Sequence, residues 1–352
     1  DRIEIISQFL DIEKNKIYKI EHHLCHSYYA YLSSNFRNKK VLCFTVDGWG
    51  DGLNATISSF DKFGNYKRLY KTNKCNIARI YRHMTLLLGM KPNEHEFKVM
   101  GLAPYAKNEY SLKVYNDVFK NILTVKNCKV VHQKRPKNLF NFIYQKTKSY
   151  RFDNIAGGVQ ILVEEISKKL LKQINQKYKL KAFSISGGVS MNIKMNMVLS
   201  KLKFVKNLYV PPTGTDESLS IGACYFLNKK DNKFLKNIYL GQKISDKKIK
   251  KKNILKFIKN KSKVHIEENC SHAKIAKLLN KGEIISIARG REEFGARALG
   301  NRSIIANPST DGIVQKINEQ IKNRDFWMPF ALTILDKNNK NYIDNEKNII
   351  SD

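Results

Sequence analysis

Three short apolar runs in the chain are each followed closely by glycine, and this pattern limits the folds that the chain can adopt. The runs are residues 41–47, 183–186 and 208–210. The first ends on Asp47, and the third leads through two prolines to Gly214 and Asp216. Short apolar runs bounded by turn residues are typical of buried strands, and glycine loops at strand ends allow a ligand to approach the backbone. The pattern predicts an α/β fold with its site at the strand ends.

The remaining periodicity predicts further elements around these strands. Strands are expected at 53–60, 66–71 and 284–288, and helices at 156–180, from Gly188 to about Leu202, at 219–227 and at 272–280. Residues 228–263 are rich in lysine and poor in strong apolar positions, with one exposed helix conceivable at 244–258. We therefore predict a first domain at 1–228, a lysine-rich linker at 229–263 and a second α/β domain at 264–352.

Charge and cysteine content restrict the partners. The chain has 64 Lys and Arg against 31 Asp and Glu, for a net charge of +33. Because lysine is spread along the whole chain, a solvated basic surface that suits small anionic substrates is the simpler interpretation, and a nucleic-acid partner is not expected. No apolar run reaches the ~18 residues of a membrane span, so no membrane partner is expected. The six scattered cysteines contain no Cys-x-x-Cys pair, which suits a reducing cytoplasm.

Histidine and aspartate residues form one candidate metal site. His22 and His26 are separated by one helical turn, so on a helix both rings share a face. Such a pair is often only a surface or core feature, and the Asp47–Gly52 segment also fits a plain hairpin turn. Two histidines with Asp47 and Asp216 would form a mixed nitrogen and oxygen set, which suits iron better than structural zinc.

Two basic segments are candidate anion sites. Lys98 is in a segment with Gly101 and Pro104 that is unusual for a structural loop. Residues 289–303 hold four arginines and three glycines, and arginine forks match phosphates and carboxylates. A nucleic-acid loop is the alternative, but Phe294 is the only aromatic residue available there for stacking.

Together these segments resemble the NodU/CmcH family of O-carbamoyltransferases. The matching motifs are His-His-x-x-His (22–26), Val-Asp-Gly-x-Gly (46–50), Lys-Val-Met-Gly-Leu-Ala-Pro-Tyr (98–105), Ser-Gly-Gly-Val-x-x-Asn (186–192), Pro-Pro-x-Gly-x-Asp (211–216) and Glu-Phe-Gly-x-Arg-Ala-Leu-Gly-Asn-Arg-Ser (293–303). The resemblance implies a Kae1-like domain of the actin/Hsp70 class, with ribonuclease H-type mixed sheets, followed by a YrdC-like α/β domain. It implies that carbamoyl phosphate and ATP, with Mg²⁺, form carbamoyl-adenylate, and that the carbamoyl group then moves to a hydroxyl of a sugar or natural-product acceptor.

The resemblance also implies a role for each matching residue. Metal ligands, for Fe²⁺, would be His22, His26, Asp47 and Asp216. The adenylate would be lined by Gly48, Gly50, Lys98, Gly101, Gly187, Gly188 and Asn192. Phosphates of carbamoyl phosphate or ATP would be held by Arg297, Arg302, Ser303 and Arg324.

The chain departs from the family pattern at both ends. Family members carry an initial His-Asp-Ser-Ala segment and continue well beyond the counterpart of Phe330, so we expect this chain to contain part of each domain, and we assign no catalytic base. Two alternatives stay open, an enzyme of the tRNA threonylcarbamoyladenosine type and a non-catalytic, nucleic-acid-binding relative. The acceptor and the oligomeric state are also open.

Overall fold

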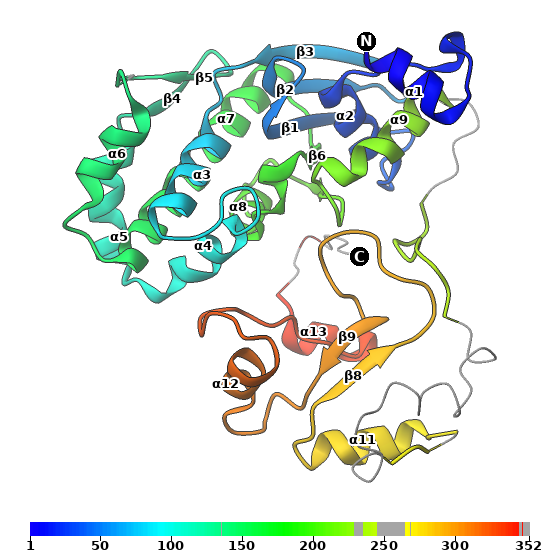
Figure 1. The fold of residues 1–352 in the computed structure, drawn as a ribbon. Helices are drawn as coiled ribbons and strands as arrows, with labels where there is room; N and C mark the ends of the chain where they lie inside the picture. Colours follow the sequence, from blue (N-terminus) through cyan, green and yellow to red (C-terminus); the bar gives the residue numbers. More distant parts are fainter. Residues whose placement is uncertain (135, 229–234, 245–264, 268, 345–346, 348–352) are drawn as a thin grey trace. The chain divides into compact units, whose positions relative to one another are not determined.

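The computed structural model describes residues 1–134, 136–228, 235–244, 265–267, 269–344 and 347 (Figure 1). Its largest sheet has the strand order β3-β2-β1-β6-β7. These strands are β1 (Val41–Gly50), β2 (Leu53–Phe60), β3 (Tyr66–Thr72), β6 (Ala182–Ser186) and β7 (Asn207–Tyr209). Strands β1 to β3 are an antiparallel meander, whereas β6 runs parallel to β1 and β7 runs parallel to β6. This is the mixed sheet expected for a ribonuclease H-type domain, and every strand predicted in this region is confirmed.

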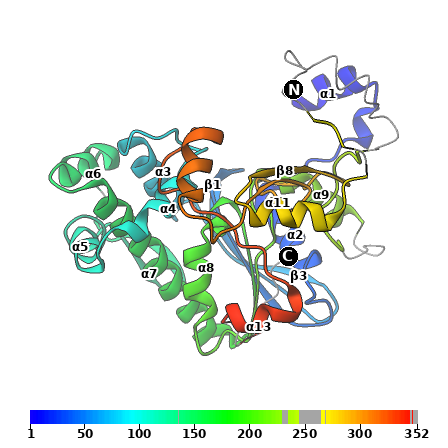
Figure 2. The same ribbon diagram turned by 90° about the horizontal axis from the view of Figure 1, so that it is seen from below.

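Helices occur before, between and after these strands, and some of them form a separate group at one end of the sheet. They are α1 (Arg2–Leu10), α2 (His22–Leu32), α3 (Ile77–Leu87), α4 (Glu96–Leu102), α5 (Asn108–Val114), α6 (Leu139–Thr147), α7 (Phe152–Tyr178), α8 (Ile193–Ser200), α9 (Leu219–Leu227) and α13 (Asn339–Tyr342). The predicted helices α7, α8 and α9 are confirmed. Helices α3 to α6 lie together, far from α1, and α7 lies beside α8 (Figures 1 and 2). A hairpin of β4 (Leu123–Lys126) and β5 (Lys129–His132) belongs to the same insertion between β3 and α7.

The two faces of the sheet follow the alternation of side chains along β1. Cys43 and Thr45 point toward α2, since the Cys43 thiol lies 3.9 Å from the carbonyl oxygen of Ser27 and Thr45 contacts His23. Leu42 and Phe44 are buried on the opposite face. Helix α2 packs on the sheet through tyrosines, and the ring of Tyr31 stacks on that of Phe60 with centroids 4.0 Å apart. The sheet therefore holds α2 in contact with β1, β2 and β6.

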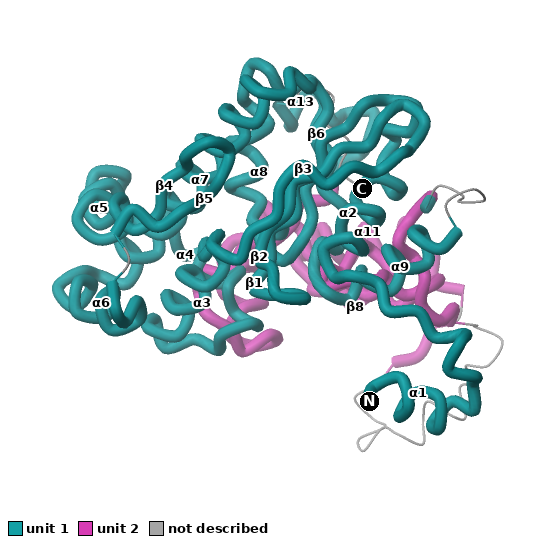
Figure 3. The backbone as a smooth tube through the Cα atoms, turned by 90° about the horizontal axis from the view of Figure 1, so that it is seen from above, with its two compact units in different colours: residues 1–235, 334–352 teal, residues 236–333 magenta. Residues whose placement is uncertain are grey.

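The chain divides into two compact units (Figure 3). Unit 1 contains residues 1–235 and 334–352, and unit 2 contains residues 236–333. Unit 2 is α/β, as expected, and contains α11 (His272–Asn280), β8 (Ile285–Ala288), β9 (Arg302–Ile305) and α12 (Ile313–Lys316). Most of the predicted linker and helix at 229–263 lies outside the described residues, so the predicted domain boundaries stay a prediction.

Helix α7 is the longest described helix, with 27 residues, and its buried positions recur at helical spacing. Its other face carries charged and amide side chains. Among the described residues, no helix is both long enough and apolar enough to cross a membrane.

Candidate metal centre and anion-binding loops

Helix α2 presents His22 and His26 on one face. Its first turn is capped by Glu21, whose carboxylate accepts a hydrogen bond of 2.8 Å from the Leu24 amide and pairs with Arg68 of β3. The His22 amide donates to Asp51 Oδ2 at 2.7 Å. Gly50 leaves the space that the His22 ring occupies, because a Cβ there would lie 2.2 Å from the ring. The start of α2 is thus fixed against the end of β1.

Two loops at the strand ends supply the carboxylates. Asp47 lies where the regular pairing of β1 with β2 is interrupted, and its Oδ2 accepts a hydrogen bond of 2.9 Å from the Gly188 amide. Asp216 begins a short 3-10 helix, and its side chain is two-thirds exposed. Hence β1 and the segment after β7 each bring one carboxylate to the histidines, as the strand-end pattern predicted.

The four side chains form a compact cluster, which we call the His/Asp cluster. One ligand atom from each of His22, His26, Asp47 and Asp216 lies within 4.8 Å of the others. His26 Nε2 is 3.2 Å from Asp47 Oδ2, and His22 Nε2 is 3.7 Å from Asp216 Oδ1. Both Nε2 atoms are buried and lack a hydrogen-bond partner of good geometry. Two such nitrogens facing two carboxylates fit a divalent metal ion.

The opposite nitrogen of His26 is held by the protein. Its Nδ1 lies 3.3 Å from the hydroxyl of Ser186, at the end of β6. A hydrogen bond at one ring nitrogen orients the other toward a metal and selects the tautomer that can bind it. The neighbouring His23, which no motif marked as a ligand, faces the sheet instead, with Nδ1 2.9 Å from the hydroxyl of Thr45.

Protonation within the cluster depends on the two carboxylates. Burial lowers the pKa of His26, but the carboxylates of Asp216 and Asp47 outweigh burial, so the net shift is upward. Burial raises the pKa of Asp47, whereas the neighbouring His22 and His26 rings and a hydrogen bond from the Gly188 amide lower it more strongly, to well below its usual range. A ligating imidazole must be neutral, so binding of a cation to the cluster should become more favourable as the pH rises.

The glycine loop after β6 lies directly against the cluster. Gly187 has φ +89°, and a Cβ there would lie 2.3 Å from the carbonyl oxygen of Val46. Its amide donates to Gly214 at 2.9 Å, which ties the loop after β6 to the loop after β7. Gly188 then points its amide at Asp47. The exposed backbone at Gly48 has no atom within 4 Å of where a Cβ would be, so a ligand can approach it closely.

The side chain of Asn192, which the family resemblance assigns to the adenylate, forms hydrogen bonds with other parts of the protein. Its side chain caps α8 by accepting from the Met195 amide at 2.9 Å. It also exchanges two hydrogen bonds with Gln160 of α7, at 3.0 and 2.9 Å. Gln160 was not singled out in the sequence, because its link to Asn192 depends on the packing of α7 against α8.

The segment that carries Lys98 and Gly101 is helical, which corrects its interpretation as an unusual loop. Both residues belong to α4, and Ala103 and Pro104 continue in a 3-10 turn. Apolar residues Val99, Met100 and Leu102 are buried, so a local apolar spacing stabilises the helix. Ala103, Pro104, Gln160 and Lys194 line a groove of about 230 Å³. This groove therefore joins the segment after Lys98 to the one after Asn192.

In unit 2, the arginine-rich segment forms a loop closed by Glu293. Glu293 Oε1 accepts hydrogen bonds from the amides of Leu299, Asn301 and Arg302, at 2.8, 2.7 and 3.1 Å. Burial raises the pKa of Glu293, but these amides outweigh it and bring the pKa to about 2. In the sequence, Glu293 is the first residue of the motif at 293–303, but its function in closing the loop was not predicted.

The structure gives the predicted phosphate ligands different surroundings. Arg302 and Ser303 belong to β9 rather than to a loop, and β9 pairs with β8. Arg302 donates to the carbonyl of Arg289 at 2.7 Å, and the Ser303 hydroxyl accepts from the Gly300 amide at 2.8 Å. Arg297 is exposed within the loop. Arg324 donates to Asn318 Oδ1 at 2.6 Å and lies over the ring of Phe330, so it is outside this loop.

The fold and cluster define an α/β protein of the ribonuclease H type with a candidate four-ligand metal centre. Residues 4–225 match the family model for the carbamoyltransferase N-terminus, and residues 276–351 match that for the carbamoyltransferase C-terminus. The chain therefore belongs to the carbamoyltransferase family.

Similar proteins span more sequence than this chain. An uncharacterized protein of Methanocaldococcus jannaschii, MJ1051, is 32% identical over 95% of this chain and 65% of its own length. The nodulation protein NolNO of Sinorhizobium fredii is 24% identical over 93% of this chain and 48% of its own length. The chain thus spans about half to two thirds of the curated relatives named here. Among solved structures, HypF of T. kodakarensis is 14% identical over 63% of this chain and 38% of its own, with a TM-score of 0.37.

Proposed function

We propose that this chain takes part in ATP-dependent carbamoyl transfer from carbamoyl phosphate, through carbamoyl-adenylate, to a hydroxyl of a sugar or natural-product acceptor. The observation that carries the proposal is the His/Asp cluster, in which two buried imidazole nitrogens without hydrogen bonds face two carboxylates. The cluster lies beside the glycine loop after β6, and Gly48 leaves open space next to Asp47 for a phosphate-bearing ligand. The family match favours this transfer over the tRNA threonylcarbamoyladenosine alternative.

In this proposal His22, His26, Asp47 and Asp216 hold Fe²⁺, which would supply Lewis-acid polarisation and orientation at the transferred group. Gly187 and Gly188 shape the loop beside the cluster, and Gly48 leaves open space for the adenylate. Lys98, Gly101, Gly50 and Asn192 complete its surroundings. The groove at Gln160 and Lys194 is the adjoining space. Arg297 neutralises the charge of carbamoyl phosphate or of the ATP phosphates, with Arg302, Ser303 and Arg324 as further contacts.

The test is release of pyrophosphate from ATP, measured on the full chain with iron and Mg²⁺ present. We expect release that requires carbamoyl phosphate, because formation of carbamoyl-adenylate releases inorganic phosphate from carbamoyl phosphate and pyrophosphate from ATP. Omission of carbamoyl phosphate is the control. A folded, metal-loaded chain that releases no pyrophosphate above this control would refute the proposed adenylation by this chain.

A further inference from the structure

The sheet edge opposite to the His/Asp cluster is lined with lysines. We call this surface the lysine edge; it consists of Lys39, Lys40, Lys179, Lys181, Lys201, Lys203 and Lys206. These lysines precede the parallel strands β1, β6 and β7, whose opposite ends carry the cluster. Register places the three loops side by side, since Leu42 pairs with Phe183 and Ala182 pairs with Asn207. The amide of Lys206 donates to the carbonyl of Lys181 at 3.0 Å.

The charge of the lysine edge is not compensated by the described protein. All seven lysines are exposed, and none pairs with a carboxylate among the described residues. No acidic residue occurs in segments 36–40, 177–181 or 201–207. Like charges gathered this closely repel one another, and an anionic partner would relieve the repulsion.

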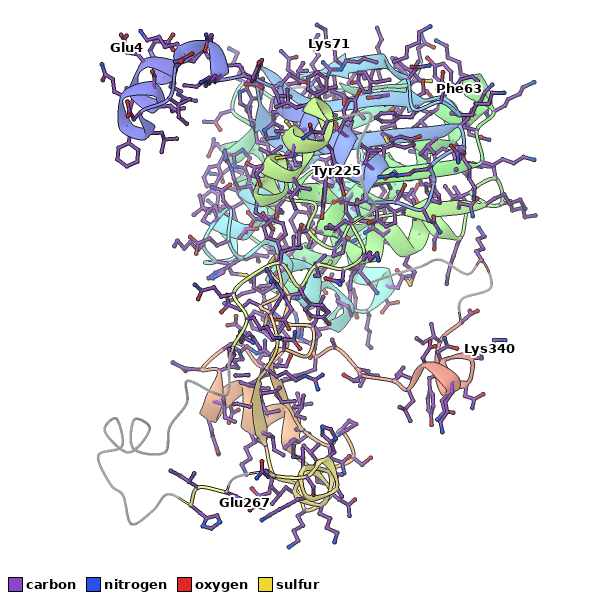
Figure 4. All side chains as sticks on the ribbon, turned by 90° about the vertical axis from the view of Figure 1, so that its right-hand side faces the viewer. Glu4, Phe63, Lys71, Tyr225, Glu267 and Lys340 are labelled. Atoms are coloured by element: carbon purple, nitrogen blue, oxygen red, sulfur yellow. The ribbon has the colours of Figure 1, made fainter. Side chains whose placement is uncertain are left out.

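A projecting aromatic ring occupies the same edge. The turn at 61–65 joins β2 to β3, and the pairing of Val41 with Phe60 places it next to Lys39 and Lys40. Phe63 in this turn is 76% exposed, and Lys62 lies over its ring at 4.8 Å. Figure 4 shows the labelled Phe63 at the periphery of unit 1. Asp61 is the one acid of the turn, and its carboxylate accepts hydrogen bonds from Phe63 and Asn65.

We propose that the lysine edge docks on an anionic lipid bilayer, with Phe63 entering the headgroup region. With an inter-strand spacing of about 4.8 Å, an edge of five strands extends over about 19 Å, a broad front that suits a planar array of phosphates. Lysine side chains reach headgroups with compact charges, while an isolated aromatic ring enters the interface. A single-stranded nucleic acid would call for a row of stacking rings instead. The expectation of no membrane partner rested on the lack of an apolar run long enough to span a bilayer. That observation concerns insertion into a bilayer, and it does not concern the docking of this surface on one.

Sedimentation of the full chain with vesicles tests the proposal. The vesicles are phosphatidylcholine with or without phosphatidylglycerol. We expect binding only with phosphatidylglycerol, decreasing as salt rises. The variant Lys40→Gln/Lys181→Gln/Lys206→Gln should lower the partition coefficient about 100-fold, because each lysine near an anionic surface contributes about fivefold. Phe63→Ser should weaken binding while leaving its salt dependence unchanged.

The matched control removes three exposed lysines elsewhere in unit 1, in Lys113→Gln/Lys120→Gln/Lys146→Gln. This control should bind vesicles nearly as well as the unchanged chain. Equal loss in the control and test variants would show that net charge alone governs binding, and would overturn the proposal. It would also be overturned if no binding to phosphatidylglycerol vesicles occurred, or if a single-stranded RNA displaced the vesicles and bound more tightly to the lysine edge. None of these results depends on carbamoyl transfer, so the proposed function is tested separately.

Discussion

In α2, the Nε2 atoms of His22 and His26 have no hydrogen-bond partner, while other contacts hold the rest of each ring in place. Ser186 contacts the Nδ1 atom of His26, and the close approach of Gly50 holds the His22 ring. Burying a polar nitrogen without a partner costs free energy, and a bound cation would offset this cost. At the residue scale, this is the physical argument for a metal ion at the His/Asp cluster.

Replacing His26 tests that argument directly. His26→Ala should lower bound iron sharply from about one equivalent, because it removes the fully buried ligand of the four. Metal content after dialysis, measured by mass spectrometry, is the readout, with circular dichroism to check the fold. The control His272→Ala removes an exposed histidine from α11 and should retain the metal. Unchanged metal content in His26→Ala would argue against the four-ligand assignment.

The lowered pKa of Glu293 predicts that the stability of the protein depends on pH. The folded pKa of about 2 lies below the ordinary glutamate pKa of 4.5, so the stabilisation is present above about pH 4.5 and is lost as the pH falls toward 2. Denaturant unfolding of the chain should therefore show a decrease in the free energy of unfolding between about pH 6 and about pH 3. Glu293→Gln should be less stable at the higher pH and lose part of this pH dependence, whereas Glu319→Gln should keep it.

At the scale of elements, α2 is the helix on which the site depends. Its start is fixed by Glu21 and Arg68, and its body packs on the sheet through tyrosines. Helix α9 crosses it closely at Gly222, where a Cβ would lie 2.1 Å from the carbonyl oxygen of Cys25. Glycine is needed at this contact because any side chain would separate the two helices.

The contact between β1 and α2 gives a matched pair of variants. Gly50→Ala places a methyl group where the His22 ring lies and should weaken iron binding at least tenfold, because one ligand must move. Gly48→Ala adds the same methyl group in open space and should retain iron affinity. Titration of the metal-free chain with Fe²⁺ under anaerobic conditions compares the two. Equal affinities would mean that Gly50 does not position His22.

At the scale of the whole molecule, the two groups of proposed site residues lie in different units. The His/Asp cluster and glycine loops belong to unit 1, and the Glu293 loop belongs to unit 2. Each is closed by its own hydrogen bonds. A substitution in one should therefore leave the local chemistry of the other intact.

Arg297→Ala should separate metal binding from pyrophosphate release. Bound iron should stay unchanged, while pyrophosphate release that depends on carbamoyl phosphate should fall at least 100-fold, as expected for loss of a charged phosphate contact. Lys281→Ala, which removes an exposed cation elsewhere in unit 2, should retain both. Loss of iron in Arg297→Ala would contradict the separation.

Local patterns in the sequence were sufficient for much of the fold. The strand at 53–60 and the helices at 219–227 and 272–280 have the predicted bounds, because apolar periodicity and flanking turn residues are local properties. The strand-end pattern and the spacing of His22 and His26 also indicated which side chains would meet. The insertion between β3 and α7 was not predicted, and the helix containing Lys98 was interpreted as a loop, since its short apolar spacing is ambiguous without its packing partners.

Tertiary structure alone decided which polar groups face one another. Asn192 and Gln160 are 32 residues apart, and Glu293 binds three amides that follow it in the loop. The hydrogen bonds that Arg302 and Ser303 form within unit 2 depend on strand register. The assembly of the lysine edge from three loops also depends on it. Sequence periodicity identifies elements because their hydrogen bonds are local, whereas the partners of a side chain depend on the packing of distant segments.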